Sequence, residues 1–290
     1  MKRKLTLSKL IKRAYERNGY VSAIVFGEMG IGKTSYALHV AAQVYGSWDK
    51  ALDCLFFKPQ DAIRVMRKAL DSGKRIPVLI MDDAGFWLGK LTWWERQKVM
   101  FMDFYNLIRT VCAGIIFTSP TDELPKIMRK KMYFRVGIQP LPRDKVDQLL
   151  KRIPGDVLRK LEEEGRDIRY WNIAKGYKLQ TLPSFMQFVR ATFEDIYPLH
   201  YPRHIYERYE EIRRQVVREA LDKVEEAFAE KEFEEHLRKN LSKMRIKREE
   251  LKKIAKDMKS EGISRRVIVK FLKAAGIPER TAYKWLQDKH

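Results

Sequence analysis

The sequence is poor in the features that mark secreted and membrane proteins. It has only two cysteines, Cys54 and Cys112. Both lie in apolar segments, so we expect buried thiols in a reducing cytoplasm. No run approaches the roughly 18 apolar residues of a transmembrane helix. No apolar core long enough for a secretory signal follows the basic start Met1-Lys2-Arg3-Lys4. These absences predict a cytoplasmic protein without a membrane partner.

Negative charge is also scarce relative to positive charge. The 59 Lys and Arg residues outnumber the 38 Asp and Glu residues, which gives a formal net charge of +21. An excess of this size predicts a polyanionic partner, nucleic acid before membrane. A surface rich in Lys, Arg and Glu, as thermophilic proteins carry, would account for part of the charge but not for its sign. With 290 residues, of which 45% are hydrophobic, we expect a globular chain of one or two domains.

The segment from Gly27 to Thr34 carries the complete phosphate-binding loop pattern, a glycine, four residues and then Gly-Lys-Thr. An apolar run over 20–26 precedes it and a helical pattern over 35–45 follows it. A strand should therefore lead into a glycine turn that opens a helix, where backbone N–H groups and the helix N-terminus bind phosphates. We predict that ATP contacts Gly27, Glu28, Met29, Gly30, Ile31, Gly32, Lys33, Thr34 and Ser35, with Lys33 at the β- and γ-phosphates.

A second apolar run, Ile76–Asp83, ends in paired carboxylates. A buried parallel strand would deliver Asp82 beside the phosphate loop, where it and the Thr34 hydroxyl would hold Mg²⁺. Asp83 would orient or deprotonate the attacking water. One further strand, predicted over 52–57, lies between the two motifs. This spacing favours the ATPase branch of phosphate-loop proteins, in which the acidic strand does not neighbour the first strand.

The next apolar run, Gly114–Pro120, ends in small hydroxyl residues. This is the position of a sensor side chain that contacts the γ-phosphate or the attacking water, with Thr118 as first choice and Ser119 as second. Arg129 and Arg135 are candidate arginine fingers. The predicted catalytic residues are Lys33, Asp83 and Thr118.

Segments 19–41 and 76–87 (with "DDAG"), together with "GIIFTSP", resemble the DnaA-like AAA ATPases of crenarchaeal fuselloviruses. They are more distantly similar to the replication initiator DnaA and to helicase loaders. The linking sequence "ALDCLFF" fits the same group, and the resemblance covers roughly residues 10–140. It implies an ATPase of a virus, plasmid or integrated element that acts on that element's DNA in the host cytoplasm. The partners expected are DNA, further copies of the chain and a replicative helicase.

Two stretches outside these motifs allow more than one interpretation. Trp87, Trp93 and Trp94 could stack on bases, form a partner surface, or pack a following helix over 95–112 against the sheet. Residues 169–179 alternate around Lys175-Gly176 and predict a β-hairpin, which would extend the sheet or contact DNA. Residues 182–203 contain three prolines and are expected to be irregular.

From Ile205 to Glu261 there is neither glycine nor proline. An apolar stripe with charged flanks predicts a long helix that serves as a lever, a dimer seam or a spacer. The stripe consists of Ile212, Val216, Val217, Leu221, Val224 and Phe228.

The residues from Leu241 onward contain 15 Lys or Arg against 6 Asp or Glu, a net charge of +9. Three helices fit, over 248–261, 264–275 and 278–289, and resemble a helix-turn-helix of the resolvase or homeodomain kind. A three-helix bundle without affinity for DNA is the alternative. If the module binds duplex DNA, the contacts predicted are Arg265, Arg266, Lys270, Arg280, Thr281 and Lys284.

Together these patterns predict an α/β fold: a parallel-sheet phosphate-loop ATPase of the AAA type with a β-hairpin extension, a long charged helix and a small all-α C-terminal domain. The domains expected are 1–204, 205–245 and 246–290. The function expected is a DNA-associated ATPase that needs ATP and Mg²⁺, in replication initiation, helicase loading or related remodelling. An ATP-switched DNA-binding regulator, or a packaging or partition motor, would carry the same motifs.

Overall fold

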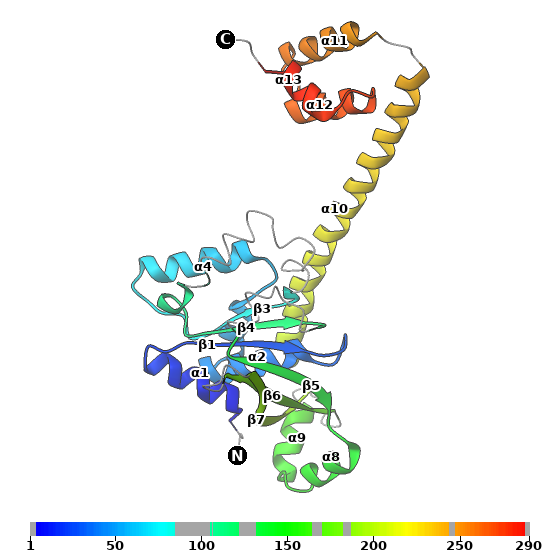
Figure 1. Cartoon of the computed structure of the whole chain (residues 1–290). Helices are drawn as coiled ribbons and strands as arrows, with labels where there is room; N and C mark the ends of the chain where they lie inside the picture. The colour runs from blue at the N-terminus through cyan, green and yellow to red at the C-terminus, as the bar shows by residue number, and fades with distance from the viewer. Residues whose placement is uncertain are drawn as a thin grey trace. The chain divides into compact units, whose positions relative to one another are not determined.

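The computed structural model describes residues 4–84, 105, 107–121, 132–163, 170–181, 187–243 and 247–287. The chain forms two compact units, Met1–Ile212 and Arg213–His290. The first unit contains a seven-stranded sheet with helices, and the second contains the C-terminal helices (Figure 1). The boundary between the units falls inside the long helix α10 (Arg203–Lys243).

The sheet has the strand order β2-β3-β4-β1-β5-β6-β7. The first five strands in this order pair in parallel, whereas β6 pairs antiparallel with both β5 and β7. This mostly parallel sheet confirms the α/β class. Because β4 lies between β3 and β1, the acidic strand does not neighbour the first strand, as the motif spacing predicts. The strands are β1 (Val21–Phe26), β2 (Leu55–Phe56), β3 (Leu79–Met81), β4 (Gly114–Ser119), β5 (Phe134–Pro140), β6 (Trp171–Thr181) and β7 (Gln187–Pro198).

Apolar side chains cover both faces of the sheet, as its nearly continuous apolar strands require. Val21, Ala23 and Val25 of β1 face one hydrophobic cluster, which they share with α1 (Thr6–Glu16) and α2 (Lys33–Tyr45). The intervening Ile24 faces the other cluster, since successive strand residues point to opposite faces. That second cluster is closed by α4 (Pro59–Asp71) and by the short 3₁₀ helix η2 (Ile108–Thr110).

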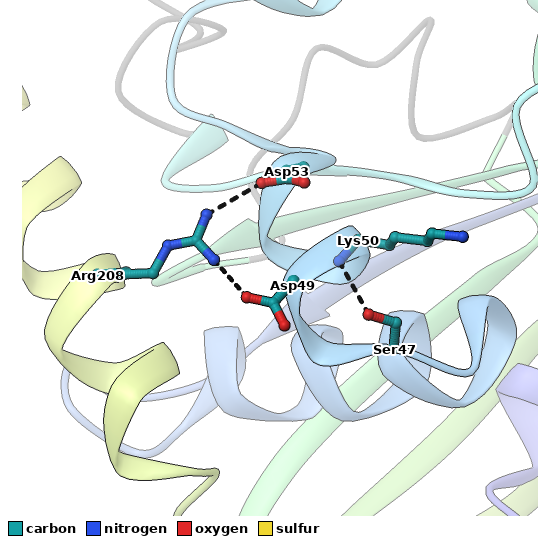
Figure 2. A network of polar contacts seen from close by, with 5 residues as sticks. All are labelled: Ser47, Asp49, Lys50, Asp53 and Arg208. Atoms are coloured by element: carbon teal, nitrogen blue, oxygen red, sulfur yellow. Dashed lines mark hydrogen bonds and ion pairs between the residues drawn. The ribbon is translucent and has the colours of Figure 1, made fainter.

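The strand predicted over 52–57 is mostly wrong, because a short helix, α3 (Trp48–Asp53), takes its first half. The Ser47 side chain caps this helix by accepting a hydrogen bond from the Lys50 N–H at 3.4 Å (Figure 2). Ala51 and Leu52 are buried on its inner face, so the apolar residues that suggested a strand serve a helix. Only Leu55 and Phe56 remain as β2.

The acidic strand is also shorter than predicted. Regular pairing begins at Leu79, and Ile76 forms only an isolated bridge with Cys112. Pro77 lies between Ile76 and Leu79 and has no N–H to donate to a neighbouring strand, which accounts for the gap in strand pairing there.

The predicted position of the hairpin turn is wrong. β6 runs straight through Lys175-Gly176, where the pairing with β7 shifts register, and continues to Thr181, which pairs with Gln187. Gly176 serves packing: a Cβ there would lie 2.2 Å from the ring of Phe193. The segment predicted to be irregular therefore contains β7. Of the two roles left open for the hairpin, extension of the sheet is confirmed, since β6 pairs with β5.

Between β5 and β6 the described residues form two helices, α8 (Arg143–Leu150) and α9 (Gly155–Glu163), with Pro154 between them. After β7 comes α10, whose 41 residues confirm the long helix expected from the absence of glycine and proline. Its first turns belong to the first unit, where Ile205 and Tyr209 are buried.

The second unit contains a three-helix bundle with its own apolar core, and its helices confirm the predicted triplet. They are α11 (Arg248–Ser260), α12 (Arg265–Ala274) and α13 (Glu279–Trp285). Gly262 and Gly276, with φ of +79° and +84°, allow the left-handed backbone at the two turns. The core consists of Leu251, Ala255, Ile268, Val269, Leu272, Ile277, Ala282 and Leu286.

Some sequence predictions fall outside the described residues, namely those for the three tryptophans, most of the helix expected over 95–112 and Arg129. Both cysteines are free thiols, with Cys112 buried and Cys54 half-buried. Within the part of the chain that the structure describes, no helix combines the length and the apolar character needed to cross a membrane.

A buried carboxylate fixes the start of the chain to the sheet extension. The N-cap residue of α1, Leu5, has no side chain that can cap the helix. Asp195 of β7, 5% exposed, takes this role by accepting hydrogen bonds from the Thr6 N–H at 2.7 Å and the Leu7 N–H at 3.3 Å. It also accepts a bond from the Tyr36 hydroxyl at 2.8 Å. One side chain therefore joins α1, α2 and β7.

We expect Asp195→Ala to lower the free energy of unfolding of the first unit by about 2–4 kcal/mol, because it leaves buried donors without an acceptor. Asp49→Ala is the matched control, since it removes an exposed carboxylate whose ion pair contributes roughly 1 kcal/mol or less. Urea unfolding measures both variants. Equal losses would show that Asp195 stabilises the fold no more than a surface carboxylate does.

Candidate nucleotide-binding site

The phosphate-loop motif forms the connection between β1 and α2, as predicted. Gly27, Gly30 and Gly32 have φ values of +150°, +80° and +94°, a backbone region that glycine occupies at little cost. Glu28, Met29 and Gly30 are exposed, whereas Ile31 and Gly32 are partly covered. The glycines of the motif are thus required by the shape of the loop itself.

The sheet extension holds the loop from outside. Asn172 of β6 donates a hydrogen bond from Nδ2 to the Ile31 carbonyl at 2.6 Å, and the Tyr197 hydroxyl of β7 donates to the Gly32 carbonyl at 3.0 Å. In a trans peptide the carbonyl and the following N–H point in opposite directions. The N–H groups of Gly32 and Lys33 therefore point away from these strands. This is the orientation in which peptide N–H groups of such a loop can receive an anion.

Two more predicted contact residues lie at the start of α2. The Lys33 ammonium, only 8% exposed as a residue, donates to the carbonyls of Gly27 at 3.0 Å and Glu28 at 2.7 Å, so it lies against the loop. Ser35 does not face the loop opening, because its hydroxyl donates to the Leu199 carbonyl. Ser35 thus links the helix to the chain that follows β7.

The structure brings three predicted residues together, because Thr34 and Thr118 both donate hydrogen bonds to Asp82. Asp82 follows β3 and is 1% exposed. Its Oδ1 accepts hydrogen bonds from the Thr34 hydroxyl at 2.8 Å and the Thr118 hydroxyl at 2.5 Å. This meeting follows from topology, since parallel β3 and β4 end at the same edge of the sheet, where α2 begins. Its Oδ2 accepts a further bond from Tyr209 of α10 at 3.0 Å.

The environment opposes ionisation of this carboxyl group. Burial raises the pKa of Asp82, and the neighbouring Asp83 charge raises it further. The hydrogen bonds from Thr118, Thr34 and Tyr209 act in the opposite direction, because they stabilise the charged form. A cation at this position would favour the charged form in the same way.

Asp83 differs from its neighbour in backbone and in exposure. Its φ of +49° lies in the left-handed region, which is uncommon for residues other than glycine, and its side chain is half-buried. Its N–H donates to the Thr118 hydroxyl at 3.0 Å, so Thr118 contacts both aspartates. The second choice for a sensor, Ser119, is buried at the end of β4, and the finger candidate Arg135 is half-buried in β5.

The oxygen ligands present suit Mg²⁺. A hydroxyl and a carboxylate, Thr34 and Asp82, already lie within hydrogen-bonding distance at the helix start. Mg²⁺ in nucleotide sites needs only one or two protein carboxylates, because substrate phosphates and water complete its coordination. Groups of three or more His, Cys, Asp or Glu that could hold a metal by themselves are absent from the described residues. The donor set fits a metal that arrives with a nucleotide.

Sequence reasoning missed Asn172, Tyr197 and Tyr209, which contact the loop or the carboxylate. Asn172 left one usable signal, since it is an amide two residues before Ala174 and lies on the same buried face of the strand. Buried amides need partners, so a structural or functional bond was to be expected. Nothing in the local sequence distinguishes Tyr209 from the other tyrosines around it.

The residues predicted to contact DNA lie in the second unit. Arg265, Arg280 and Lys284 are exposed, whereas Lys270 and Thr281 are half-buried. The Arg265 guanidinium lies 5.3 Å from the centre of the Tyr283 ring. The side chain of Arg266 lies outside the described residues. The exposed cations thus include residues of both α12 and α13.

Comparison with known proteins identifies relatives in archaeal viruses. Over 150 residues the chain is 41% identical to an uncharacterized protein, B-251, of Sulfolobus spindle-shape virus 1. That match covers 47% of this chain and 60% of B-251, so it spans three fifths of that relative. Over 208 residues the chain is 27% identical to an uncharacterized protein, ORF286, of Acidianus two-tailed virus. This match covers 68% of this chain and 69% of ORF286. A viral origin fits these similarities.

Other comparisons contribute less. No family model matches the chain. Among solved structures, the flagellar accessory protein FlaH from Methanocaldococcus jannaschii matches 65% of this chain and 97% of its own, at 15% identity and a TM-score of 0.30. A TM-score this low carries no argument about fold, which rests on the strand order and the loop geometry above.

Gly32→Ala and Gly30→Ala form a matched pair that tests the clamp on the loop. Both place alanine at positive φ, which costs about 1–2 kcal/mol. A Cβ at Gly32 would also lie 2.3 Å from Leu199 Cδ1 and 3.0 Å from Asn172 Nδ2, whereas at Gly30 nothing lies within 4 Å. We expect Gly32→Ala to lower the free energy of unfolding by about 1 kcal/mol more than Gly30→Ala, because the ends of the Leu199 and Asn172 side chains must move. Equal values in urea unfolding would contradict the packing of β6 and the chain after β7 against the loop.

Proposed function

We propose that this chain is a Mg²⁺-dependent ATPase. The observation that carries the proposal is the hydrogen bond between Thr34, the hydroxyl residue of a complete phosphate-loop motif, and Asp82, the carboxylate that follows a buried parallel strand. Either motif alone could arise in other proteins. Their meeting at 2.8 Å, on one edge of a parallel sheet, is the arrangement with which phosphate-loop NTPases hold Mg²⁺.

The roles of the side chains follow from their positions. Lys33 would neutralise phosphate charge from the loop, and Thr34 and Asp82 would hold Mg²⁺. Asp83, the less buried aspartate, would accept the proton of the attacking water or orient it. Thr118, which contacts both aspartates, would hold them in position and could reach the γ-phosphate. The bound metal would supply charge stabilisation for the transferred phosphoryl group.

We further propose that the ATPase acts on DNA of a viral or other mobile element. Three observations support this: the net charge of +21, the separate three-helix unit with exposed cations, and the relatives in two archaeal viruses. Duplex DNA is the favoured ligand, because a helix of such a module fits the major groove. Replication initiation, helicase loading or related remodelling would use these two activities together, with further copies of the chain as partners.

The ATPase proposal predicts different defects for three substitutions. Lys33→Ala should weaken ATP binding or abolish turnover, because the main phosphate cation is lost. Asp82→Asn should impair the Mg²⁺-dependent part of binding. Asp83→Asn should leave Mg²⁺·ATP bound while hydrolysis falls by about two orders of magnitude or more. Nucleotide titration and phosphate release measure the two properties. Unchanged hydrolysis in Lys33→Ala would disprove the phosphate-loop assignment.

The DNA proposal predicts a site-specific effect of charge. Lys284→Ala on α13 should weaken binding to duplex DNA, because one phosphate contact is lost. The salt slope, which is the steepness with which log affinity falls with log salt concentration, should decrease by about one. Lys256→Ala on α11 removes the same charge at another exposed position of the bundle, and we expect the salt slope to stay unchanged. Binding at several salt concentrations gives both slopes. Identical slopes in the two variants would contradict a contact through α13.

A further inference from the structure

Among the described residues of the C-terminal half, Tyr209 is the one that donates a hydrogen bond to Asp82. It lies in the second turn of α10, is 4% exposed, and donates its hydroxyl to Asp82 Oδ2 at 3.0 Å. Its ring stacks on Phe57 beside β2, with the centroids 6.1 Å apart, and meets the edge of Tyr201 at 6.4 Å. The hydroxyl therefore enters the site on a ring held by neighbours on two sides.

The start of α10 is fixed to the body of the first unit by charge as well as by packing. Arg208, the residue before Tyr209, extends to both Asp49 and Asp53 of α3, as Figure 2 shows. Ile205, one turn earlier, is fully buried. The location of the Tyr209 hydroxyl is thus determined by the docking of this turn onto α3 and β2.

The hydrogen bonds at Asp82 leave few acceptor positions. A carboxylate has about four lone-pair positions, two on each oxygen. Oδ1 accepts two hydrogen bonds, from Thr34 and Thr118, whereas Oδ2 accepts one, from Tyr209. Counting the bonds between described residues, one position on Oδ2 remains for a metal ion or its bound water, and the bond from Tyr209 decides where that position points.

We propose that Tyr209 is a positioning residue for the metal site, which holds Asp82 Oδ2 in the orientation that Mg²⁺ or its bound water needs. The inference rests on the proposed ATPase function and adds a residue to it that lies 127 positions away from Asp82 in the chain. The tyrosine touches neither nucleotide nor metal in this role; it acts through the carboxylate.

Tyr209→Phe tests the proposal, because it keeps the packed ring and removes only the hydroxyl. Affinity for a non-hydrolysable ATP analogue is measured with Mg²⁺ and with EDTA, and the ratio of the two gives the gain due to Mg²⁺. We expect this gain to fall roughly tenfold, as loss of one hydrogen bond to a charged group allows. The affinity in EDTA should stay as in the wild type, since the loop is untouched.

Tyr206→Phe is the matched control, since Tyr206 is a 48% exposed tyrosine of the same helix that donates no hydrogen bond to Asp82. Its Mg²⁺ gain should equal that of the wild type. In an Asp82→Asn background, Tyr209→Phe should cause no further loss, because the group through which it acts is already changed.

Two results would overturn the inference: a wild-type Mg²⁺ gain in Tyr209→Phe, or an equal loss of affinity with and without Mg²⁺. The second result would mean that Tyr209 supports the loop and not the carboxylate. A wild-type protein that binds no ATP analogue, or binds it without any gain from Mg²⁺, would instead refute the ATPase function itself.

Discussion

The structure of the candidate site depends on one buried carboxylate. Asp82 is almost inaccessible to solvent, and a charge in such a position persists only if polar groups surround it. Three hydroxyls do so, from α2, β4 and α10. The same hydrogen bonds therefore stabilise the charge and join the phosphate loop, the sheet and the long helix. A shift of any of these elements would change the environment of the group proposed to hold the metal.

The antiparallel extension of the sheet has two roles that the sequence does not reveal. It covers the edge of β5, and it supplies Asn172 and Tyr197, which bind the carbonyls of the phosphate loop. Asp195 on the same extension fixes the start of α1. Phosphate-binding loops owe their function to peptide groups with a defined orientation, so strands that fix those peptides belong to the site as much as the motif does.

Sequence patterns predicted best where the determinant is local. The glycines of the loop, the apolar run before Asp82 and the lack of glycine and proline in α10 each led to the correct element, because backbone sterics and periodicity act within a few residues. They failed where packing overrides a local preference. Gly176 marked a turn by its composition, yet it is a strand residue that makes room for Phe193. The prediction at Leu52 is wrong for a different reason, since a local signal, the N-cap residue Ser47, starts a helix where a strand is predicted.

The sequence alone predicts the α/β class, the separation of the acidic strand from the first strand, and the meeting of Thr34, Asp82 and Thr118 at one edge of the sheet. It could do so because parallel strands bring their carboxyl ends to one edge whatever the details of packing. Which distant side chains contact these residues depends on the tertiary packing. Asn172, Tyr197 and Tyr209 reach it through the pairing of β6 with β5 and the docking of α10, and contacts across more than a hundred residues leave no periodic signal in the chain.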